Sequence, residues 1–116
     1  MVSNYFFMAT GVTNRRRGFG FERELVTKAK EAGLDSQRAW GSNGASLGKH
    51  PEVDLTIDVY DIQAKRRKAL PAYLQVPDCC DAVIFRQDRG TTLVLMELDE
   101  WLSIIKELKA LSNKQT

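Results

Sequence analysis

An acid, an amide and an amine near the middle of the chain, Asp54, Gln63 and Lys65, could act together if the chain folds back between them. The runs 53–59 and 60–65 alternate apolar and polar residues, which is typical of half-buried strands. With a tight turn centred after residue 58, residues whose numbers sum to 117 lie opposite one another, so Asp54 faces Gln63. Lys65 lies two residues further and points to the same side. We therefore expect a carboxylate, a carboxamide and an ammonium group on one sheet face.

A fourth polar group comes from a predicted helix earlier in the chain. The stretch from Phe19 to Ala32 has apolar residues at helical spacing, and Gly33 is a natural terminator. Glu22 lies at the N-terminal end of that apolar stripe, where a buried carboxylate needs a partner. A divalent cation held by Asp54, Gln63 and Glu22 would satisfy all three groups, and ligands that are all oxygens favour Mg²⁺, with Mn²⁺ as a substitute.

Such a site would suit the hydrolysis of a phosphodiester. A bound metal ion polarises a phosphate oxygen and lowers the pKa of a bound water, while Lys65 holds that water or stabilises charge in the transition state. Two basic clusters flank the predicted site in the sequence: Arg15, Arg16 and Arg17, and then Lys65 with Arg66, Arg67 and Lys68. They would attract a polyanionic backbone. A basic run is also common on any solvated surface, and the formal net charge is only +2, so their position matters more than their number.

Length and composition indicate one globular domain. The chain has 116 residues, 43% of them hydrophobic, which suits a single packed core. Cys79 and Cys80 are adjacent, a spacing that rarely forms a disulfide, and with His50 as the only histidine a zinc site is not expected. Free thiols, no signal-peptide pattern at the start and no apolar run long enough to span a bilayer predict a cytoplasmic protein without membrane contact.

The expected fold class is α/β, with one central mixed sheet flanked by helices in the order α-β-β-β-α-β-β-α. We expect an irregular arm over 1–14, one domain over 15–112 and a tail over 113–116. Beyond the elements named above, we expect a strand at 36–40, a Gly/Ser-rich loop before residue 53, a short helix at 71–76, a hairpin of strands 82–85 and 91–98, and a last helix capped by Asp99.

Several short motifs, in this order, resemble one family of nucleases. PEVD at 51–54 followed by QAK at 63–65 resembles the PD…(D/E)xK signature of metal-dependent nucleases, with Gln in the middle position and the Pro displaced by two residues. GFGFERELV at 18–26 and RAWGS at 38–42 are similar to the archaeal-type Holliday-junction resolvases and their phage-encoded relatives. The resemblance covers roughly residues 15–85.

The resemblance implies a restriction-endonuclease-like fold and a homodimer with two active sites that cut opposite strands of branched DNA, a four-way junction, symmetrically. It implies Mg²⁺-dependent catalysis by Glu22, Asp54, Gln63 and Lys65, in a prokaryotic cell or a phage-infected host. It also places three further residues near the scissile phosphate: Arg23, Arg38 and Ser42. Gln63 stands where the family has Glu, which removes one negative charge from the metal site and should weaken metal affinity.

Other readings stay open at this point. A nuclease of the same fold could act on flaps, ends or duplex sites, and a protein whose metal site is weakened by Gln63 could bind DNA without cutting it. A plain interaction domain would show no salt-dependent DNA affinity. Glu22 could be a surface acid at a helix start, and Ser42 a simple loop residue. Trp40 and Tyr60 could stack on bases, but we expect them to pack in the core. The apolar residues 93–96 and 101–111 are expected to supply the core and a dimer surface.

Overall fold

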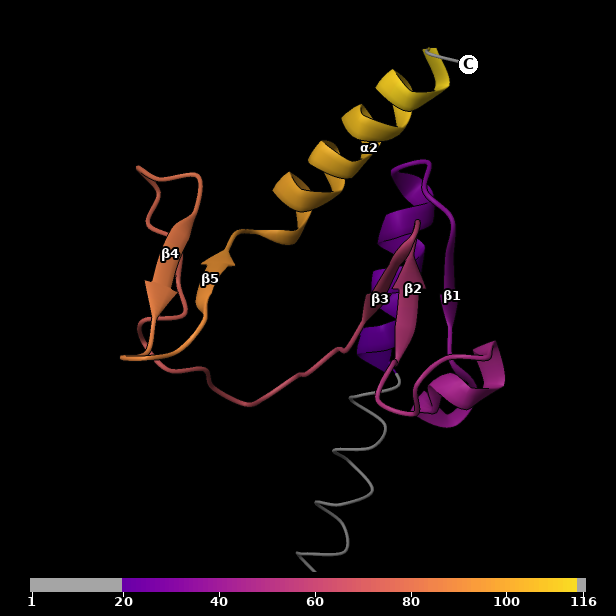
Figure 1. Cartoon of the computed structure of the whole chain (residues 1–116), viewed down its shortest axis with the longest axis horizontal. Coiled ribbons are helices and arrows are strands. Elements are labelled where there is room, and N and C mark those ends of the chain that lie inside the picture. The colour runs from indigo at the N-terminus through magenta and orange to yellow at the C-terminus, as the bar shows by residue number, and fades with distance from the viewer. Residues whose placement is uncertain (1–19, 115–116) are drawn as a thin grey trace, which may run out of the picture. The chain divides into compact units, whose positions relative to one another are not determined.

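The computed structural model describes residues 20–114, and its helices and strands are shown in Figure 1. The described part of the chain divides into two compact units, the first ending at Arg66 and the second beginning at Arg67. Helices and small antiparallel sheets occur in one chain, so the fold class is α/β, as the sequence predicts. No helix among the described residues is long and apolar enough to cross a membrane.

Within the described residues, the first unit starts with a helix over 20–31. Gly33 ends it in the left-handed conformation, with φ at 83°. The Gly33 N–H donates to Lys30 O and the Leu34 N–H to Ala29 O, both at 2.9 Å, which is the paired bonding of a Schellman motif. The predicted role of Gly33 as a terminator is therefore confirmed.

The helix is followed by a three-stranded antiparallel sheet in the order β1-β2-β3. The strands are β1 (Ser36–Arg38), β2 (Leu55–Ile57) and β3 (Tyr60–Ile62). The pairs Leu55 with Ile62, Thr56 with Asp61 and Ile57 with Tyr60 follow the predicted register, since each sums to 117. Each strand is shorter than predicted, because polar residues and the turn at Asp58, where φ is 53°, leave only three residues to pair.

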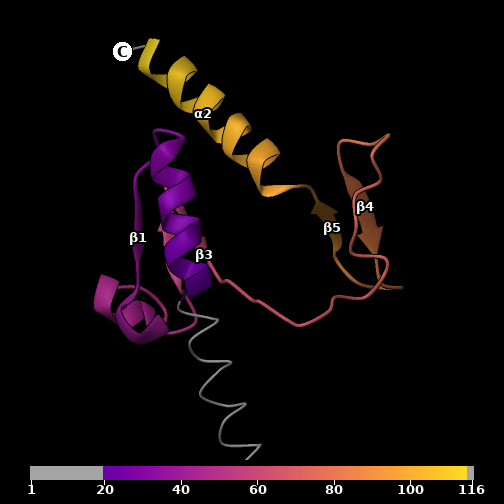
Figure 2. The same cartoon turned by 180° about the vertical axis from the view of Figure 1, so that it is seen from behind.

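The core of the first unit lies between this helix and one face of the sheet. Leu25 and Ala29 from the helix are buried, as are Leu55 and Ile57 from the central strand β2. Figures 1 and 2 show from opposite sides that the helix runs across one face of the three strands. Ser36 is buried as well, and its hydroxyl donates to Thr56 O at 2.7 Å, which satisfies its polar group inside the core.

The connection between β1 and β2 is more regular than the loop predicted from its composition. It contains two short 3-10 helices, η1 (Trp40–Ser42) and η2 (Gly44–Leu47). Asn43 lies between them, and its side chain accepts a hydrogen bond from the Ala45 N–H at 3.0 Å. Asn and Ser side chains that bond to nearby backbone groups stabilise such turns, so this connection has a defined path.

The second unit contains a hairpin and a long helix. The hairpin pairs β4 (Val83–Arg86) with β5 (Thr92–Leu95), and its turn is closed by the Gly90 N–H donating to Gln87 O at 2.8 Å. The helix α2 spans Leu98–Lys114, with Leu102 and Ile105 as its buried residues. Both the hairpin and the last helix are predicted from the sequence.

Three predicted features differ from the structure. The described strands form two antiparallel sheets rather than one mixed sheet, because no ladder forms over residues 63–82. The helix predicted at 71–76 is only a turn, closed by the Leu74 N–H donating to Pro71 O at 2.9 Å, since a stretch between two prolines is too short to nucleate a helix. Asp99 lies inside the first turn of α2 rather than capping it, because the Trp101 N–H bonds to Glu97 O at 3.2 Å.

Candidate active site

Chain segments far apart in the sequence meet at one edge of the three-stranded sheet. The register pairs Arg38 with Leu55 and Leu55 with Ile62, so the end of β1, the start of β2 and the end of β3 lie together. An ion pair between Glu22 and Arg38 brings the first turn of the described helix to the same edge. The predicted site residues from these segments therefore share a neighbourhood.

Glu22 and Arg38 form the most deeply buried charged contact at this edge. The Glu22 side chain is 5% exposed and the Arg38 side chain 24% exposed, and Glu22 Oε2 lies 3.9 Å from Arg38 Nη1. That separation suits an ion pair but is longer than a hydrogen bond. The sequence predicts that a carboxylate at this place would be buried and need a partner, and the Arg38 guanidinium is one such partner. The reading of Glu22 as a surface acid is wrong.

Asp54 is tied into the sheet by its backbone and by its side chain. The Ala39 N–H donates to Asp54 O at 2.8 Å, and the Asp54 N–H donates to Ile62 O at 2.9 Å. Ile62 is already paired with Leu55, so Asp54 and Leu55 both face Ile62 where the ladder between β2 and β3 ends. Asp54 is therefore held by backbone bonds to both neighbouring segments, just before β2 begins.

The Asp54 carboxylate links the start of β2 to the chain beyond β3. Its Oδ2 accepts a hydrogen bond from the Ala64 N–H at 2.8 Å, and this bond is partly buried. Ala64 lies between Gln63 and Lys65, so the bond fixes the backbone that carries both predicted side chains. Gln63 and Lys65 are themselves exposed, and they follow the last residue of β3 rather than belonging to it. Their shared face with Asp54 stays a prediction.

The donor groups at this edge have the chemistry that a hard divalent cation requires. Glu22, Asp54 and Gln63 offer carboxylate and amide oxygens, with no thiolate or imidazole among them. Within residues 20–114 there is no cluster of three or more histidines, cysteines or acidic residues that could hold a metal ion. Because residue 63 is Gln, the predicted ligands are two carboxylates and one amide rather than three carboxylates. All three ligands offer oxygen, as a hard cation prefers, but the set carries one negative charge fewer than three carboxylates would.

The residues predicted to contact DNA are of three kinds: those exposed in the structure, those outside its described part, and one that is engaged in an ion pair. Arg23 is exposed on the first described helix, and the second cluster is exposed at the boundary of the two units: Lys65, Arg66, Arg67 and Lys68. Ser42 lies in η1, but its side chain is outside the described part. The first cluster, Arg15 to Arg17, also lies outside the described residues. Arg38 reaches Glu22, so part of its charge is already engaged inside the protein.

Two features of the site are not found from the sequence. The Asp54–Ala64 bond forms where the ladder between β2 and β3 ends, and no local pattern reveals it because the end of a ladder is set by pairing between strands. Trp40 is 80% exposed at the start of η1, although core packing was the expectation for this side chain. Its position directly before a Gly/Ser-rich stretch is the one signal that could have indicated exposure, since such a stretch offers no apolar stripe to join.

Comparison with known proteins identifies a family that matches this chain. A family model described as archaeal Holliday junction resolvase matches residues 13–114, which is most of the chain. No curated protein and no solved structure matches the chain. The match includes every segment that meets at the edge of the sheet, from the helix with Glu22 to the residues after β3. The chain therefore belongs to the archaeal Holliday junction resolvase family.

Proposed function

We propose that this protein resolves four-way DNA junctions by hydrolysing phosphodiester bonds at the edge where β1, β2 and β3 meet. Membership of a restriction-endonuclease-like family of resolvases makes it a nuclease, and branched DNA is the substrate that the family implies. The observation that carries the proposal is the Asp54 carboxylate, held at 2.8 Å by the Ala64 N–H between the two strands of the candidate site.

Each chain residue has a distinct task in this proposal. In phosphodiester hydrolysis a water oxygen bonds to phosphorus and the bond to one bridging oxygen breaks, so negative charge grows on the phosphate and on the leaving oxygen. The Lys65 ammonium group stabilises that charge or holds the attacking water. Arg23 and the run Arg66–Lys68 bind neighbouring phosphates, which positions the strand. Arg38 keeps the buried Glu22 carboxylate in place at 3.9 Å.

Glu22, Asp54 and Gln63 would hold a Mg²⁺ ion, with Mn²⁺ able to replace it. When bound, such an ion supplies Lewis-acid stabilisation and a more acidic water. The family is divalent-metal dependent in general, and the oxygen-only donor set supports Mg²⁺ as the ion. With an amide in place of one carboxylate, we expect weaker metal binding than an all-acidic site would give.

We further propose that the active form is a homodimer with one site per subunit, which nicks opposite strands of a junction symmetrically. Four-way junctions present pairs of equivalent strands, so a two-fold symmetric protein matches them with two identical sites. Analytical ultracentrifugation of the protein would measure the subunit number. A junction labelled on each strand in turn would show paired nicks at equivalent positions, whereas single unpaired nicks would argue against the symmetric dimer.

Cleavage of a synthetic four-way junction by Asp54→Asn tests the catalytic proposal. The Asn oxygen can still accept the Ala64 N–H, so the fold is kept while the negative charge is lost. We expect cleavage with Mg²⁺ to fall by about 100-fold or more, while junction binding stays close to wild type. Lys65→Ala should behave in the same way.

The matched control is Asp88→Asn, which removes an exposed carboxylate from the second unit. It should cut like the wild type. Full cleavage by Asp54→Asn would remove the proposed mechanism. Junction binding without any cleavage by the wild type, at any concentration of Mg²⁺ or Mn²⁺, would instead favour a non-catalytic DNA-binding protein. The amide at Gln63 is the observation that keeps this second candidate, because it lowers the charge at the metal site.

A further inference from the structure

We propose that Trp40 makes this site selective for branched DNA, by stacking its indole on a base that is exposed at the branch point. The inference rests on the proposed function and extends it from catalysis to the choice of substrate. It is carried by three observations: the exposure of the indole, the fixed path of its backbone, and the short covalent connection between Trp40 and the candidate active site.

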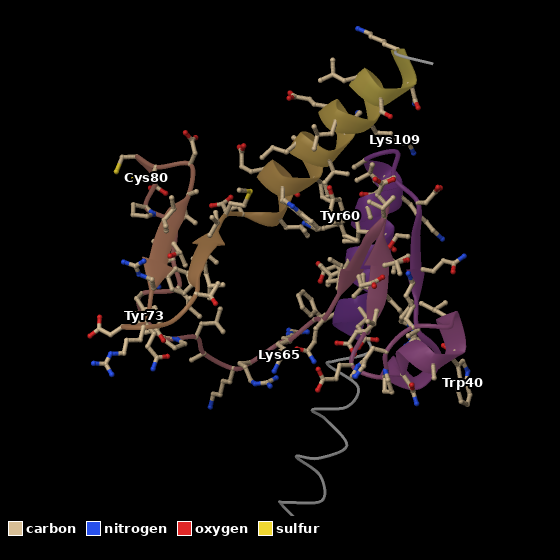
Figure 3. The ribbon with its side chains drawn as sticks, viewed as in Figure 1. Trp40, Tyr60, Lys65, Tyr73, Cys80 and Lys109 are labelled. Carbon is tan, nitrogen blue, oxygen red and sulfur yellow. The ribbon has the colours of Figure 1, made fainter. Side chains whose placement is uncertain are left out.

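The first observation is exposure. Trp40 is 80% exposed, the highest value among the large hydrophobic side chains that are exposed in the described part of the chain. An indole has a large apolar surface, and leaving it in water gives up the stabilisation that burial would provide. Figure 3 shows Trp40 projecting outward from the segment between β1 and β2. An exposed indole is well suited to a flat partner that arrives from solution.

The second observation is that the backbone of Trp40 is held on both sides. Its N–H donates to Ser46 Oγ at 2.8 Å, and its carbonyl accepts from the Asn43 N–H at 3.2 Å. Ser46 Oγ also donates to Asn43 O at 3.1 Å, so Trp40, Asn43 and Ser46 are linked pairwise by hydrogen bonds. A side chain presented from such a segment loses less conformational entropy on binding than one on a mobile loop.

The third observation is proximity along the chain. Ala39, the residue before Trp40, is fully buried and donates its N–H to Asp54 O at 2.8 Å. Arg38, one residue earlier, forms the ion pair with Glu22. Trp40 therefore directly follows two residues in contact with the site: Ala39, which bonds to the Asp54 backbone, and Arg38, whose side chain pairs with the Glu22 carboxylate. A base that contacts this indole would bring its own strand to the site.

The chemistry of stacking explains why the effect would select junctions. In an intact duplex the faces of the bases are covered by their neighbours, whereas a branch point interrupts that stack and exposes base faces. Every base has a π face, so an indole can stack on any of them without reading sequence. Trp40 would add binding energy for branched DNA and very little for linear duplex, which the basic residues bind equally well in both forms.

The neighbours of Trp40 favour DNA over a protein partner as the occupant. The connection from 41 to 50 contributes glycine, asparagine, serine, lysine and histidine, with Leu47 as its large apolar residue. The centre of a protein–protein contact is depleted in lysine and serine and gathers apolar side chains, of which the sequence from 41 to 50 has few. A single aromatic side chain among small and polar residues is the arrangement of a base-stacking contact.

Binding measured with a chelator present, so that no strand is cut, tests the proposal directly. In a Trp101→Phe protein, Trp40 is the single tryptophan and its fluorescence reports on its own surroundings. We expect the emission to be quenched when a four-way junction is added and to change much less with a linear duplex of the same total length. Trp101→Phe by itself should bind both DNAs like the wild type.

The affinity of Trp40→Ala provides the second measurement. We expect its Kd for the junction to rise by about 5- to 150-fold, from the free energy of stacking one base, and its Kd for duplex to stay within about twofold. Trp40→Phe keeps an aromatic face and should recover most of the loss. Thermal melting of each variant should match the wild type, since an indole that is 80% exposed contributes little to the core.

Several results would overturn this inference. Equal losses on junction and duplex would make Trp40 a general contact, and unchanged emission on saturation with junction would remove the stacking. A change of emission with protein concentration in the absence of DNA would show that a second copy of the chain covers the indole. If the wild type itself has no preference for the junction, the proposed function fails together with the inference. A junction preference that survives Trp40→Ala overturns only the inference.

Discussion

At the scale of single residues, the buried Glu22–Arg38 pair is the feature that sets this site apart from an ordinary surface cluster. Glu22 is 4% exposed, and a carboxylate without compensating positive charge is costly at such a depth. Arg38 supplies one compensating charge at 3.9 Å. A divalent cation would supply more, so metal binding and the Arg38 contact should both stabilise the folded protein.

Arg38→Ala should therefore lower the stability of the protein as well as its activity. Removing the guanidinium leaves the Glu22 carboxylate less well compensated, and we expect the free energy of unfolding to fall by about 1–3 kcal/mol, below the value for fully buried pairs because Arg38 is 24% exposed. Urea denaturation would measure it. Arg38→Lys keeps a charge and should lose less. An unchanged midpoint for Arg38→Ala would show that the pair does not stabilise the fold.

Gln63→Glu should strengthen metal binding. The change restores a third carboxylate to the predicted ligand set, and a higher ligand charge raises the affinity for a hard cation. Titration calorimetry with Mg²⁺ or Mn²⁺ should show a lower Kd for the variant than for the wild type. Gln75→Glu adds the same charge at an exposed position in the second unit and should leave the Kd unchanged. Equal affinities for Gln63→Glu and the wild type would remove Gln63 from the ligand set.

The sequence predicts much of this site at the residue scale, and the limits of the prediction have physical causes. The register of the hairpin follows from alternation around a two-residue turn, and it is confirmed over the three pairs from Leu55 to Ile62. The bonds of Asp54 are not predictable in the same way, because its backbone bonds to Ala39 and Ile62 and its side chain bonds to Ala64, beyond the end of the ladder. The exposure of Trp40 follows from tertiary packing, which the composition of one segment does not determine.

At the scale of elements, the connection between β1 and β2 packs closely against the residues that precede Asp54. Gly44 is buried in it, and its N–H faces Pro51 O at 3.5 Å while Lys49 N–H donates to Gly44 O at 2.9 Å. A methyl group at Gly44 would meet the Val53 Cβ at 2.9 Å and the carbonyl oxygen of His50. Val53 precedes Asp54, so a shift here would reach the candidate catalytic carboxylate.

Gly44→Ala should therefore destabilise the protein and reduce cleavage, with an expected loss of about 1–3 kcal/mol in the free energy of unfolding from overpacking. Gly48→Ala is the informative comparison. Gly48 has φ at 71° but nothing near its added methyl group, so it should cost only about 1 kcal/mol from backbone strain. Denaturation midpoints and cleavage rates of the two variants would separate crowding from strain. A smaller effect for Gly44→Ala than for Gly48→Ala would contradict this account.

Elements with strong local sequence signals were predicted well, whereas features that depend on pairing between distant segments were not. The 20–31 helix has an apolar stripe and a glycine terminator, and the 83–95 hairpin has a turn signal, so both follow from short-range patterns. The stretch 71–76 has a proline at its start and little else, and it forms a turn. One central sheet was expected because strands usually pair with neighbours, but the residues between β3 and β4 form no ladder.

At the scale of the whole molecule, the positive charge that we expect to contact DNA is concentrated in the sequence rather than spread. The formal net charge is +2, yet four basic residues follow one another from Lys65 to Lys68, and all four are exposed. Each phosphate contact releases counterions, so DNA binding should depend on salt far more strongly than the net charge indicates. The division of the chain into units falls inside this run, between Arg66 and Arg67.

Replacing Arg67 and Lys68 together by alanine should weaken junction and duplex binding alike and reduce the slope of log K against log salt by about 2, close to one for each lost phosphate contact. Fluorescence anisotropy over a series of salt concentrations would measure it. Lys106→Ala with Lys114→Ala removes the same charge from exposed positions of α2 and serves as the control. Equal slopes for the two double variants would mean that net charge, rather than the basic run, governs binding.

The position of that run has a consequence for handling and assaying the protein. An exposed stretch of lysine and arginine without a strand or helix, lying where one compact unit gives way to the next, is an ideal substrate for trypsin. Brief digestion should split the chain there before it cuts elsewhere within residues 20–114. Bound DNA should shield the same peptide bonds from trypsin. The rate of this first cut would therefore report the fraction of protein bound to DNA, without a label and without DNA cleavage.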